Sequence, residues 1–228
     1  MARIEPARSA PRITGRGRRP VLRNERCYHI QVATRSAKGF SNRVETVFID
    51  RDGVLNEKAP EGRYVARWDH FRVLPGVPEA LSKLNHAGLR VIVVSNQRGI
   101  ALGLYSAADV EAVQAKFQQL LKPFGARVDA FYFCPHEKGQ CNCRKPQPGM
   151  FERAVAEFPS VTAEASVMIG DSLSDIEFGR RLGMSTILIE GDLANSKPGT
   201  EEAAQIAGLR CASLLTAVDA LLSSLKLP

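Results

Sequence analysis

Residues 46–53 read Thr-Val-Phe-Ile-Asp-Arg-Asp-Gly, a short apolar run that ends in two aspartates and a glycine. The β-branched and aromatic residues predict a strand over Thr46–Ile49, with Asp50 directly after it. Side chains two positions apart on an extended chain point to the same side, so Asp50 and Asp52 should face one site, and Gly53 permits a sharp turn. Adjacent carboxylates disfavour ionisation unless a cation lies between them, and their hard oxygens suit Mg²⁺. The stretch therefore predicts a strand that ends in a metal-assisted acidic site.

The sequence around this stretch is typical of an α/β domain. From residue 44 onward, short β-branched runs alternate with longer segments of helical period. The other expected strands are Leu89–Val94, Ala130–Phe133, Ser166–Ile169 and Ser185–Ile189, and the expected helices are Val77–Ala87, Ala107–Leu121, Gly149–Phe158, Asp175–Leu182 and Ala212–Leu225. Ser106 can cap one helix start, and Gly88 and Gly183 can close two helix ends. We therefore expect a parallel sheet covered on both faces, with ligands bound outside the carboxyl ends of its strands.

The basic charge of the chain is concentrated at its start. The 228 residues have a formal net charge of +7, and residues 1–43 hold eleven basic against two acidic side chains. Because this segment is rich in Arg, Pro, Gly and Ser, we expect a disordered tail over 1–43 and one folded domain over 44–228. A solvated extension, an over-extended reading frame, a transit peptide and a nucleic-acid-binding arm all remain open for the tail. No run of about 18 apolar residues or secretory signal occurs, so we expect a cytoplasmic protein without a membrane span.

Three more polar clusters occur beside the expected strands. Ser95-Asn96-Gln97 offers hydroxyl and amide donors that could hold a phosphate oxygen without adding negative charge. Arg144-Lys145 adds two cations that could offset the charge of phosphoryl oxygens. Gly170-Asp171-Ser172 would deliver a third carboxylate to the same edge of the sheet, as a Mg²⁺ site assembled from separate strands requires. Asp175 is either a support of that site or the cap of the next helix.

Together these four clusters resemble the motif set of the haloacid dehalogenase superfamily, over roughly Val44 to Glu190. The resemblance implies a three-layer, Rossmann-like parallel sheet with a minimal cap, and a Mg²⁺-dependent hydrolase of phosphate monoesters that acts through an aspartyl-phosphate. It implies that Asp50 is the nucleophile and that Asp52 alternates as general acid and base. The alternative is that the aspartates are turn and cap residues of an unrelated, catalytically inactive binding module.

The same resemblance implies the remaining roles in the site. Asp50, Asp171 and the backbone carbonyl of Asp52 would hold Mg²⁺. The residues expected to bind phosphate or substrate are Ser95, Asn96, Gln97, Arg144 and Lys145, with Ser95 and Lys145 stabilising the transferring phosphoryl group.

A cluster of cysteines precedes the two cations. Residues 134–143 read Cys-Pro-His-Glu-Lys-Gly-Gln-Cys-Asn-Cys. The thiolates of Cys134, Cys141 and Cys143 with the imidazole of His136 make a full tetrahedral set for a structural Zn²⁺. Ordinary reduced thiols are the alternative. A zinc site here would order the loop that leads into Arg144-Lys145.

The cysteine-rich loop and the Gly99-Ile100-Ala101 run narrow the resemblance. The loop is similar to the branch that contains the D-glycero-D-manno-heptose 1,7-bisphosphate 7-phosphatases and the histidinol-phosphate phosphatases. The Asp50-Arg51-Asp52-Gly53 motif and the Gly99-Ile100-Ala101 run look closer to the heptose enzymes, so heptose bisphosphate is the leading substrate. Arg98 stands where heptose enzymes commonly have a small residue, and Leu102 where they have an arginine. We expect a monomeric enzyme of carbohydrate metabolism acting on a sugar phosphate. A histidinol-phosphate phosphatase and a nucleic-acid-associated end phosphatase or binding protein remain as alternatives.

Overall fold

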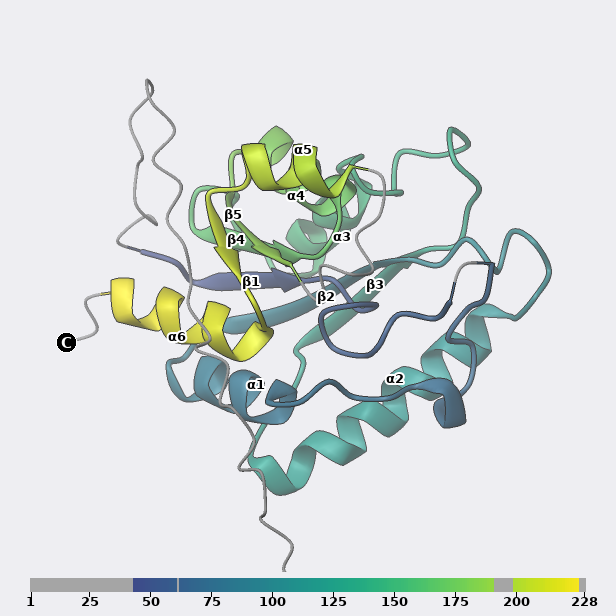
Figure 1. Ribbon diagram of the computed structural model, residues 1–228, viewed down its shortest axis with the longest axis horizontal. Coiled ribbons are helices and arrows are strands. Elements are labelled where there is room, and N and C mark those ends of the chain that lie inside the picture. The colour runs from purple at the N-terminus through teal and green to yellow at the C-terminus, as the bar shows by residue number, and fades with distance from the viewer. Residues whose placement is uncertain (1–42, 61, 191–198, 226–228) are drawn as a thin grey trace, which may run out of the picture.

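Six parallel strands form one sheet in the computed structural model, which describes residues 43–60, 62–190 and 199–225. The strands are β1 (Thr46–Ile49), β2 (Arg90–Asn96), β3 (Ala130–Cys134), β4 (Ser166–Gly170), β5 (Ser185–Ile189) and β6 (Leu209–Cys211), in the order β3-β2-β1-β4-β5-β6 (Figure 1). The chain leaves β1 toward β2 on one side and returns through β4 on the other. The carboxyl ends of β1 and β4 therefore form the switch point where open α/β sheets bind ligands.

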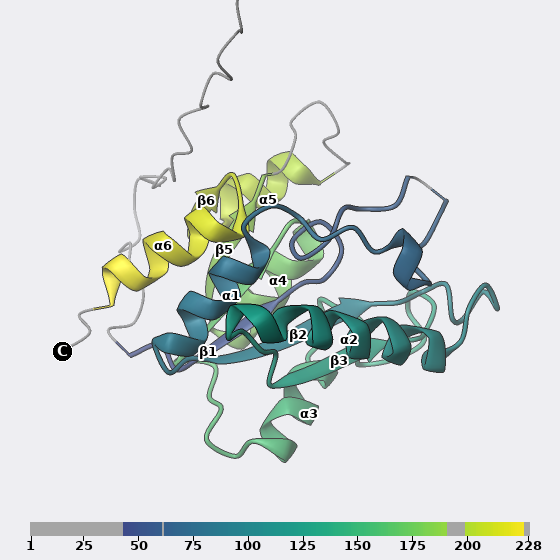
Figure 2. The ribbon, with the colours of Figure 1, turned by 90° about the horizontal axis from the view of Figure 1, so that it is seen from below.

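Helices cover both faces of this sheet, as Figures 1 and 2 show. One face carries α1 (Val77–His86), α2 (Ala107–Leu121) and α6 (Leu214–Ser224), and the other carries α3 (Gly149–Glu157), α4 (Leu173–Leu182) and α5 (Thr200–Ile206). Two short 3₁₀ turns, η1 (Trp68–His70) and η2 (Lys122–Phe124), lie in connections. The predicted three-layer fold is confirmed. Within the part of the chain that the structure describes, the helices lack the length and hydrophobicity of a membrane span.

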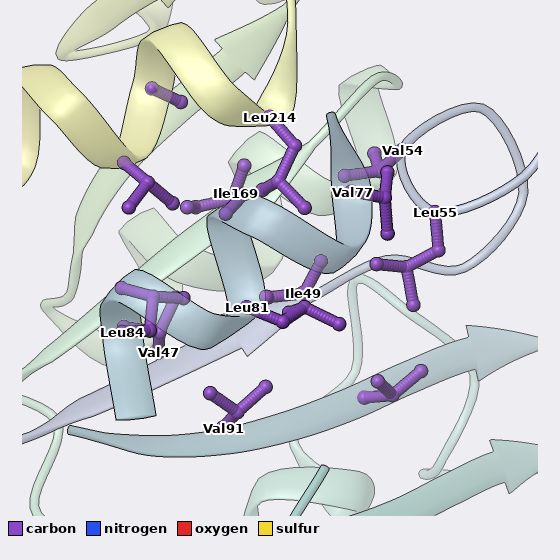
Figure 3. Close-up of a cluster of buried hydrophobic side chains, with 14 of the residues drawn as sticks. Val47, Ile49, Val54, Leu55, Val77, Leu81, Leu84, Val91, Ile169 and Leu214 are labelled. Carbon is purple, nitrogen blue, oxygen red and sulfur yellow. The ribbon is translucent and has the colours of Figure 1, made fainter. Parts of the chain in front are cut away.

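The central strand β1 is buried on both faces. Val47 and Ile49 pack toward α1 and α6, beside side chains such as Leu81 (Figure 3). Phe48 points the other way and packs edge-on against Phe178 of α4. Because helices cover both faces, apolar residues are favourable at every position of the strand, which explains its continuous hydrophobic run. The strand therefore holds the residue that follows it, Asp50, on a rigid support.

The expected helices and strands agree with the structure, apart from some helix starts and two short elements that the sequence prediction missed. Ser106 caps α2 in a capping box with Asp109, as predicted. The expected helix Asp175–Leu182 begins earlier, because Ser172 is its N-cap. The sequence prediction missed α5 and β6, since elements of seven and three residues are too short to display a period. The expected tail, apart from Arg43, lies outside the described residues.

Candidate active site

Three carboxylates meet at the carboxyl ends of β1 and β4. Asp50 directly follows β1, Asp171 directly follows β4, and Asp175 lies in the first turn of α4. One carboxylate oxygen of each lies within 4.8 Å of the others. The sequence predicted Asp50 and Asp171 at one site, and it left Asp175 as either a support of that site or the cap of the next helix.

The contacts of Asp175 are compatible with both of the alternatives that the sequence left open. Its Oδ2 accepts hydrogen bonds from the backbone N–H of Ser172 at 3.1 Å and from the Ser172 hydroxyl at 2.5 Å, which caps α4. Its Oδ1 lies 2.6 Å from Nζ of Lys145. Gly170 makes room for this side chain, because a Cβ there would collide with the carboxyl group of Asp175. Asp175 therefore joins the helix start to the charge network of the site.

Lys145 is the buried cation at the centre of this network. Its Nζ donates to Oδ1 of Asp50 at 2.6 Å and to the carbonyl oxygen of Val94 at 2.7 Å, besides its pair with Asp175. Burial alone would lower the pKa of Lys145, but the carboxylates of Asp175 and Asp50 outweigh burial and hold that pKa above its usual value. The ammonium therefore stays charged and fixed beside Asp50.

The carboxylates carry more negative charge than the nearby cations offset. Burial raises the pKa of Asp50 to about 7, opposed by Lys145 and reinforced by Asp175, Asp171 and Asp52. Burial likewise raises the pKa of Asp171 to about 6, although Lys58 acts in the opposite direction. Oδ1 of Asp171 is buried and has no hydrogen-bond partner among the described residues. A pair of hard, poorly neutralised oxygens at Asp50 and Asp171 fits a divalent cation such as Mg²⁺.

Asp52 belongs to a separate hydrogen-bond network. Its Oδ1 accepts from Nη2 of Arg51 at 3.0 Å and from Nδ2 of Asn56 at 2.9 Å, and its Oδ2 accepts from Nε2 of Gln97 at 3.1 Å. The Asp52 side chain remains 28% exposed. These contacts engage both oxygens of the Asp52 carboxylate, which is not one of the three carboxylates whose oxygens lie within 4.8 Å of one another.

The predicted phosphate-binding run 95–97 divides into different contacts. Nε2 of Gln97 donates to the Ser95 hydroxyl oxygen at 2.6 Å, and Oε1 of Gln97 accepts from the Tyr105 hydroxyl at 2.8 Å. The Asn96 amide exchanges two hydrogen bonds with the backbone of Lys145, at 3.0 and 3.2 Å. Gln97 and Asn96 thus hold other site residues in place, whereas the Ser95 hydroxyl keeps its proton for a further acceptor.

Sequence reasoning missed two side chains that orient Asp52. Arg51 is almost fully buried and donates to the carbonyl oxygen of Val65 as well as to Asp52. Asn56 is fully buried, and its Nδ2 also donates to the carbonyl oxygen of Glu57. Both lie in the segment after β1, but nothing in the local sequence distinguishes a buried polar residue from a turn residue there.

The cavity beside Lys145 is the candidate substrate pocket. It has a volume of about 540 Å³, and its lining includes Asn96, Lys138, Arg144, Ser174 and Glu177. Nη1 of Arg144 is buried and has no hydrogen-bond partner among the described residues. Arg144 and Lys138 bring two cations to the lining of this cavity, which suits an anionic ligand.

The predicted zinc ligands converge around one point. Sγ of Cys141 lies 3.5 Å from Sγ of Cys134 and 3.4 Å from Sγ of Cys143, while Nδ1 of His136 lies 3.3 Å and 3.8 Å from the sulfurs of Cys143 and Cys134. A tetrahedral Zn²⁺ with bonds of about 2.3 Å to sulfur sets ligand atoms roughly 3.8 Å apart. Burial opposes ionisation of Cys141, but hydrogen bonds from Cys143 and the backbone N–H of Arg144 lower the pKa of Cys141 to about 7. The donor set therefore fits a structural zinc ion.

The cysteine-rich loop is packed tightly against the start of α3. The backbone N–H of Gly149 donates to the carbonyl oxygen of Asn142 at 2.8 Å. A Cβ at Gly149 would lie 2.8 Å from that oxygen and 2.9 Å from Cα of Cys143, so only glycine allows this approach. On its other side, Glu137 accepts a hydrogen bond from Nε of Arg98 at 2.7 Å. Lys145 thus follows a loop that is anchored at several points.

The raised pKa values predict how pH affects stability without bound Mg²⁺. The pKa of Asp50 rises from 3.8 to about 7 and that of Asp171 to about 6, so between these limits the folded chain binds more protons than the unfolded chain. Protonation of Asp50 and Asp171 therefore stabilises the folded chain fully below about pH 3.8, and this stabilisation is lost as the pH rises through about 7. In Mg²⁺-free buffer, the melting temperature of the wild type relative to an Asp50→Asn variant should fall from about pH 4 to about pH 8. If the melting temperature of the wild type relative to Asp50→Asn instead rises with pH, the raised pKa of Asp50 is contradicted.

Comparison with known proteins identifies the family. A D-glycero-alpha-D-manno-heptose-1,7-bisphosphate 7-phosphatase of Mycobacterium tuberculosis is 40% identical over 137 residues, which cover 60% of this chain and 72% of the relative. This chain belongs to the haloacid dehalogenase-like phosphatases. The family model described as HAD-hydrolase-like matches residues 142–218. A Pseudomonas putida member named D-glycero-beta-D-manno-heptose-1,7-bisphosphate 7-phosphatase is 35% identical over 64% of this chain and 83% of its own length.

Solved structures of haloacid dehalogenase-like phosphatases have the same fold. The D,D-heptose 1,7-bisphosphate phosphatase of B. bronchiseptica, complexed with magnesium and phosphate, superposes with a TM-score of 0.68 at 29% identity and covers 79% of this chain and 99% of its own. The corresponding enzyme of Burkholderia thailandensis gives a TM-score of 0.56 at 28% identity, covering 78% and 99%. The family resemblance inferred from the four motifs is thus confirmed.

Proposed function

We propose that this phosphatase removes the C7 phosphate of a D-glycero-D-manno-heptose 1,7-bisphosphate with the help of Mg²⁺. The observation that carries the proposal is the buried arrangement of Asp50, Lys145 and Asp171 at the switch point of the sheet. The names of the relatives support the heptose substrate. Asp50 and Asp171 are the side chains that would hold Mg²⁺, together with the backbone carbonyl of Asp52. Bound Mg²⁺ would supply charge neutralisation and polarise the phosphoryl oxygens.

Phosphoryl transfer begins at Asp50. A carboxylate oxygen of Asp50 attacks phosphorus as the bond from phosphorus to the sugar oxygen breaks, which gives an aspartyl-phosphate. Lys145 lies beside Oδ1 of Asp50 and offsets negative charge that develops on the phosphoryl oxygens. The Ser95 hydroxyl donates its remaining proton to one of these oxygens. The chain's own contribution is therefore to position the nucleophile and to neutralise charge around it.

Proton transfer falls to Asp52. In its protonated form Asp52 gives its proton to the leaving sugar oxygen, and as a carboxylate it then takes a proton from the attacking water. The water oxygen bonds to phosphorus while the bond to Asp50 breaks, which releases phosphate and restores both carboxyl groups. Arg51, Asn56 and Gln97 fix the orientation of Asp52 for both steps.

The cavity beside Lys145 is the proposed place for the rest of the sugar bisphosphate. Arg144 and Lys138 contribute cations to its lining, and a guanidinium there suits the second phosphate. We further propose that zinc held by Cys134, His136, Cys141 and Cys143 fixes Arg144. The relatives are named for different anomers, so both anomers belong in the test.

Phosphate release with Mg²⁺ across a panel of substrates tests this proposal. The panel contains the α and β anomers of heptose 1,7-bisphosphate, histidinol phosphate, simple sugar monophosphates and a 3′-phosphorylated oligonucleotide. We expect a kcat/KM for one heptose anomer at least about 100-fold above that for the monophosphates, since a second phosphate adds charge-assisted hydrogen bonds. If the enzyme prefers histidinol phosphate or the oligonucleotide, the proposed heptose substrate is wrong. If it releases phosphate from no compound of the panel, the proposed phosphatase activity is wrong.

A further inference from the structure

Lys58 forms an ion pair across the site with Asp171. It lies in the segment between β1 and η1, and its ammonium contacts Oδ2 of Asp171. Gly53 has a φ of +98°, and a Cβ there would collide with Oδ2 of Asp171 and with Cε of Lys58. The absence of a side chain at position 53 thus makes room for this pair.

Lys58 is held less firmly than Lys145 and Arg51, the cations that contact Asp50 and Asp52. Lys145 is 2% exposed, donates hydrogen bonds to Asp50 and to a backbone carbonyl, and forms an ion pair with Asp175. Arg51 is 3% exposed and binds both Asp52 and a backbone carbonyl. The Lys58 side chain is 31% exposed, and within the described residues Asp171 is the partner it contacts. Of these three cations, Lys58 can therefore leave its carboxylate with the least disruption of other contacts.

Asp171 has two oxygens in different situations. Oδ2 contacts Lys58, whereas Oδ1 is buried without a hydrogen-bond partner and belongs to a carboxylate that fits Mg²⁺. A divalent cation bound to this carboxylate would lie a few ångströms from the ammonium, where like charges repel strongly in a partly buried site. Both cations also draw on the same carboxylate charge. Mg²⁺ and the Lys58 ammonium thus oppose each other at Asp171.

We infer that Lys58 is a displaceable counter-ion that competes with Mg²⁺ for Asp171. Its ammonium offsets the charge of Asp171 when no metal is bound, and it moves away when Mg²⁺ binds. Lys58 therefore weakens Mg²⁺ affinity and stabilises the metal-free protein. The inference rests on the assignment of Asp171 to Mg²⁺ in the proposed function, but it does not depend on which phosphate ester is hydrolysed.

Calorimetric titration of the full chain with MgCl₂, without substrate and near pH 8, tests the inference. Lys58→Met keeps an apolar chain but loses the charge, so its Kd for Mg²⁺ should be at least about fivefold lower than that of the wild type. Lys58→Arg keeps the charge and should stay within about twofold of the wild type. Lys83→Met is the matched control, because Lys83 pairs with Glu79 and Asp219 on the helical face of α1 and α6. Its Mg²⁺ affinity should not change.

Thermal unfolding gives a second readout. In Mg²⁺-free buffer, Lys58→Met should unfold at a lower temperature than the wild type. Saturating Mg²⁺ should raise the melting temperature of Lys58→Met by more than it raises that of the wild type. Equal or weaker Mg²⁺ binding by a folded Lys58→Met variant, or no Mg²⁺ binding by the wild type, would overturn the inference. If the wild type releases no phosphate but Lys58→Met binds Mg²⁺ more tightly than the wild type, the proposed function is wrong and the inference about Lys58 stands.

Discussion

Replacing Asp50 with Asn should lower the rate of phosphate release by about 10⁴-fold or more, the order found when a covalent nucleophile is removed. An amide has nearly the shape of a carboxyl group but cannot attack phosphorus as an anion. The fold should persist, because Lys145 keeps its pair with Asp175 and its hydrogen bond to Val94. Stability near neutral pH without Mg²⁺ should be equal or higher, since one of several crowded carboxylates is gone.

Single-turnover phosphate release and thermal unfolding measure these two effects separately. Asp219→Asn is the matched control, because Asp219 is an exposed residue of α6 that pairs with Lys83 away from the site. It should leave the rate unchanged. An Asp50→Asn enzyme that retains a tenth or more of wild-type activity would rule out nucleophilic attack by this residue.

Replacing Cys141 with Ser should remove zinc and lower the melting temperature by roughly 10 °C, because structural zinc sites contribute several kcal/mol to folding. Cys141 lies between the sulfurs of Cys134 and Cys143, at 3.5 and 3.4 Å, so its loss opens the donor set. Activity should fall as well, because the same loop leads into Lys145. The loss should be greater at elevated temperature, where the loop depends most on its metal.

Zinc content per chain by elemental analysis is the direct measurement for this variant. Asn142→Ser changes the neighbouring residue, whose exposed side chain is not among the four donors, and it should retain zinc and stability. If Cys141→Ser carries as much zinc as the wild type, or if the wild type binds none, the cluster is a group of ordinary thiols.

The sequence predicted the parts of this protein that depend on local periodicity and on the position of strand ends. The run before Asp50 has the composition of a doubly buried strand, and the parallel sheet brings Asp50 and Asp171 to one edge. The four cysteine-loop donors were readable because their number and types are complete within ten residues. Each of these predictions rests on a local sequence pattern or on the rule that parallel strands end at one edge of the sheet.

Pairings between distant residues were not readable in the same way. Asn96 and Gln97 are predicted to bind phosphate, and the structure adds contacts that the sequence did not predict, between their amides and the Lys145 backbone, Ser95, Asp52 and Tyr105. A polar side chain can have many partners, and only the folded chain selects among them. The pair of Lys58 with Asp171 joins residues more than a hundred positions apart, and no local signal marks it.

The double use of Asp175 has a consequence for how this enzyme can change by mutation. One oxygen of its carboxylate caps α4, and the other accepts the ammonium of Lys145. Asparagine would preserve a cap but not the charge, and glutamate would keep the charge but place it on a longer side chain, away from the present position of the Asp175 carboxylate. No single substitution can therefore adjust helix stability and catalytic electrostatics independently at this position.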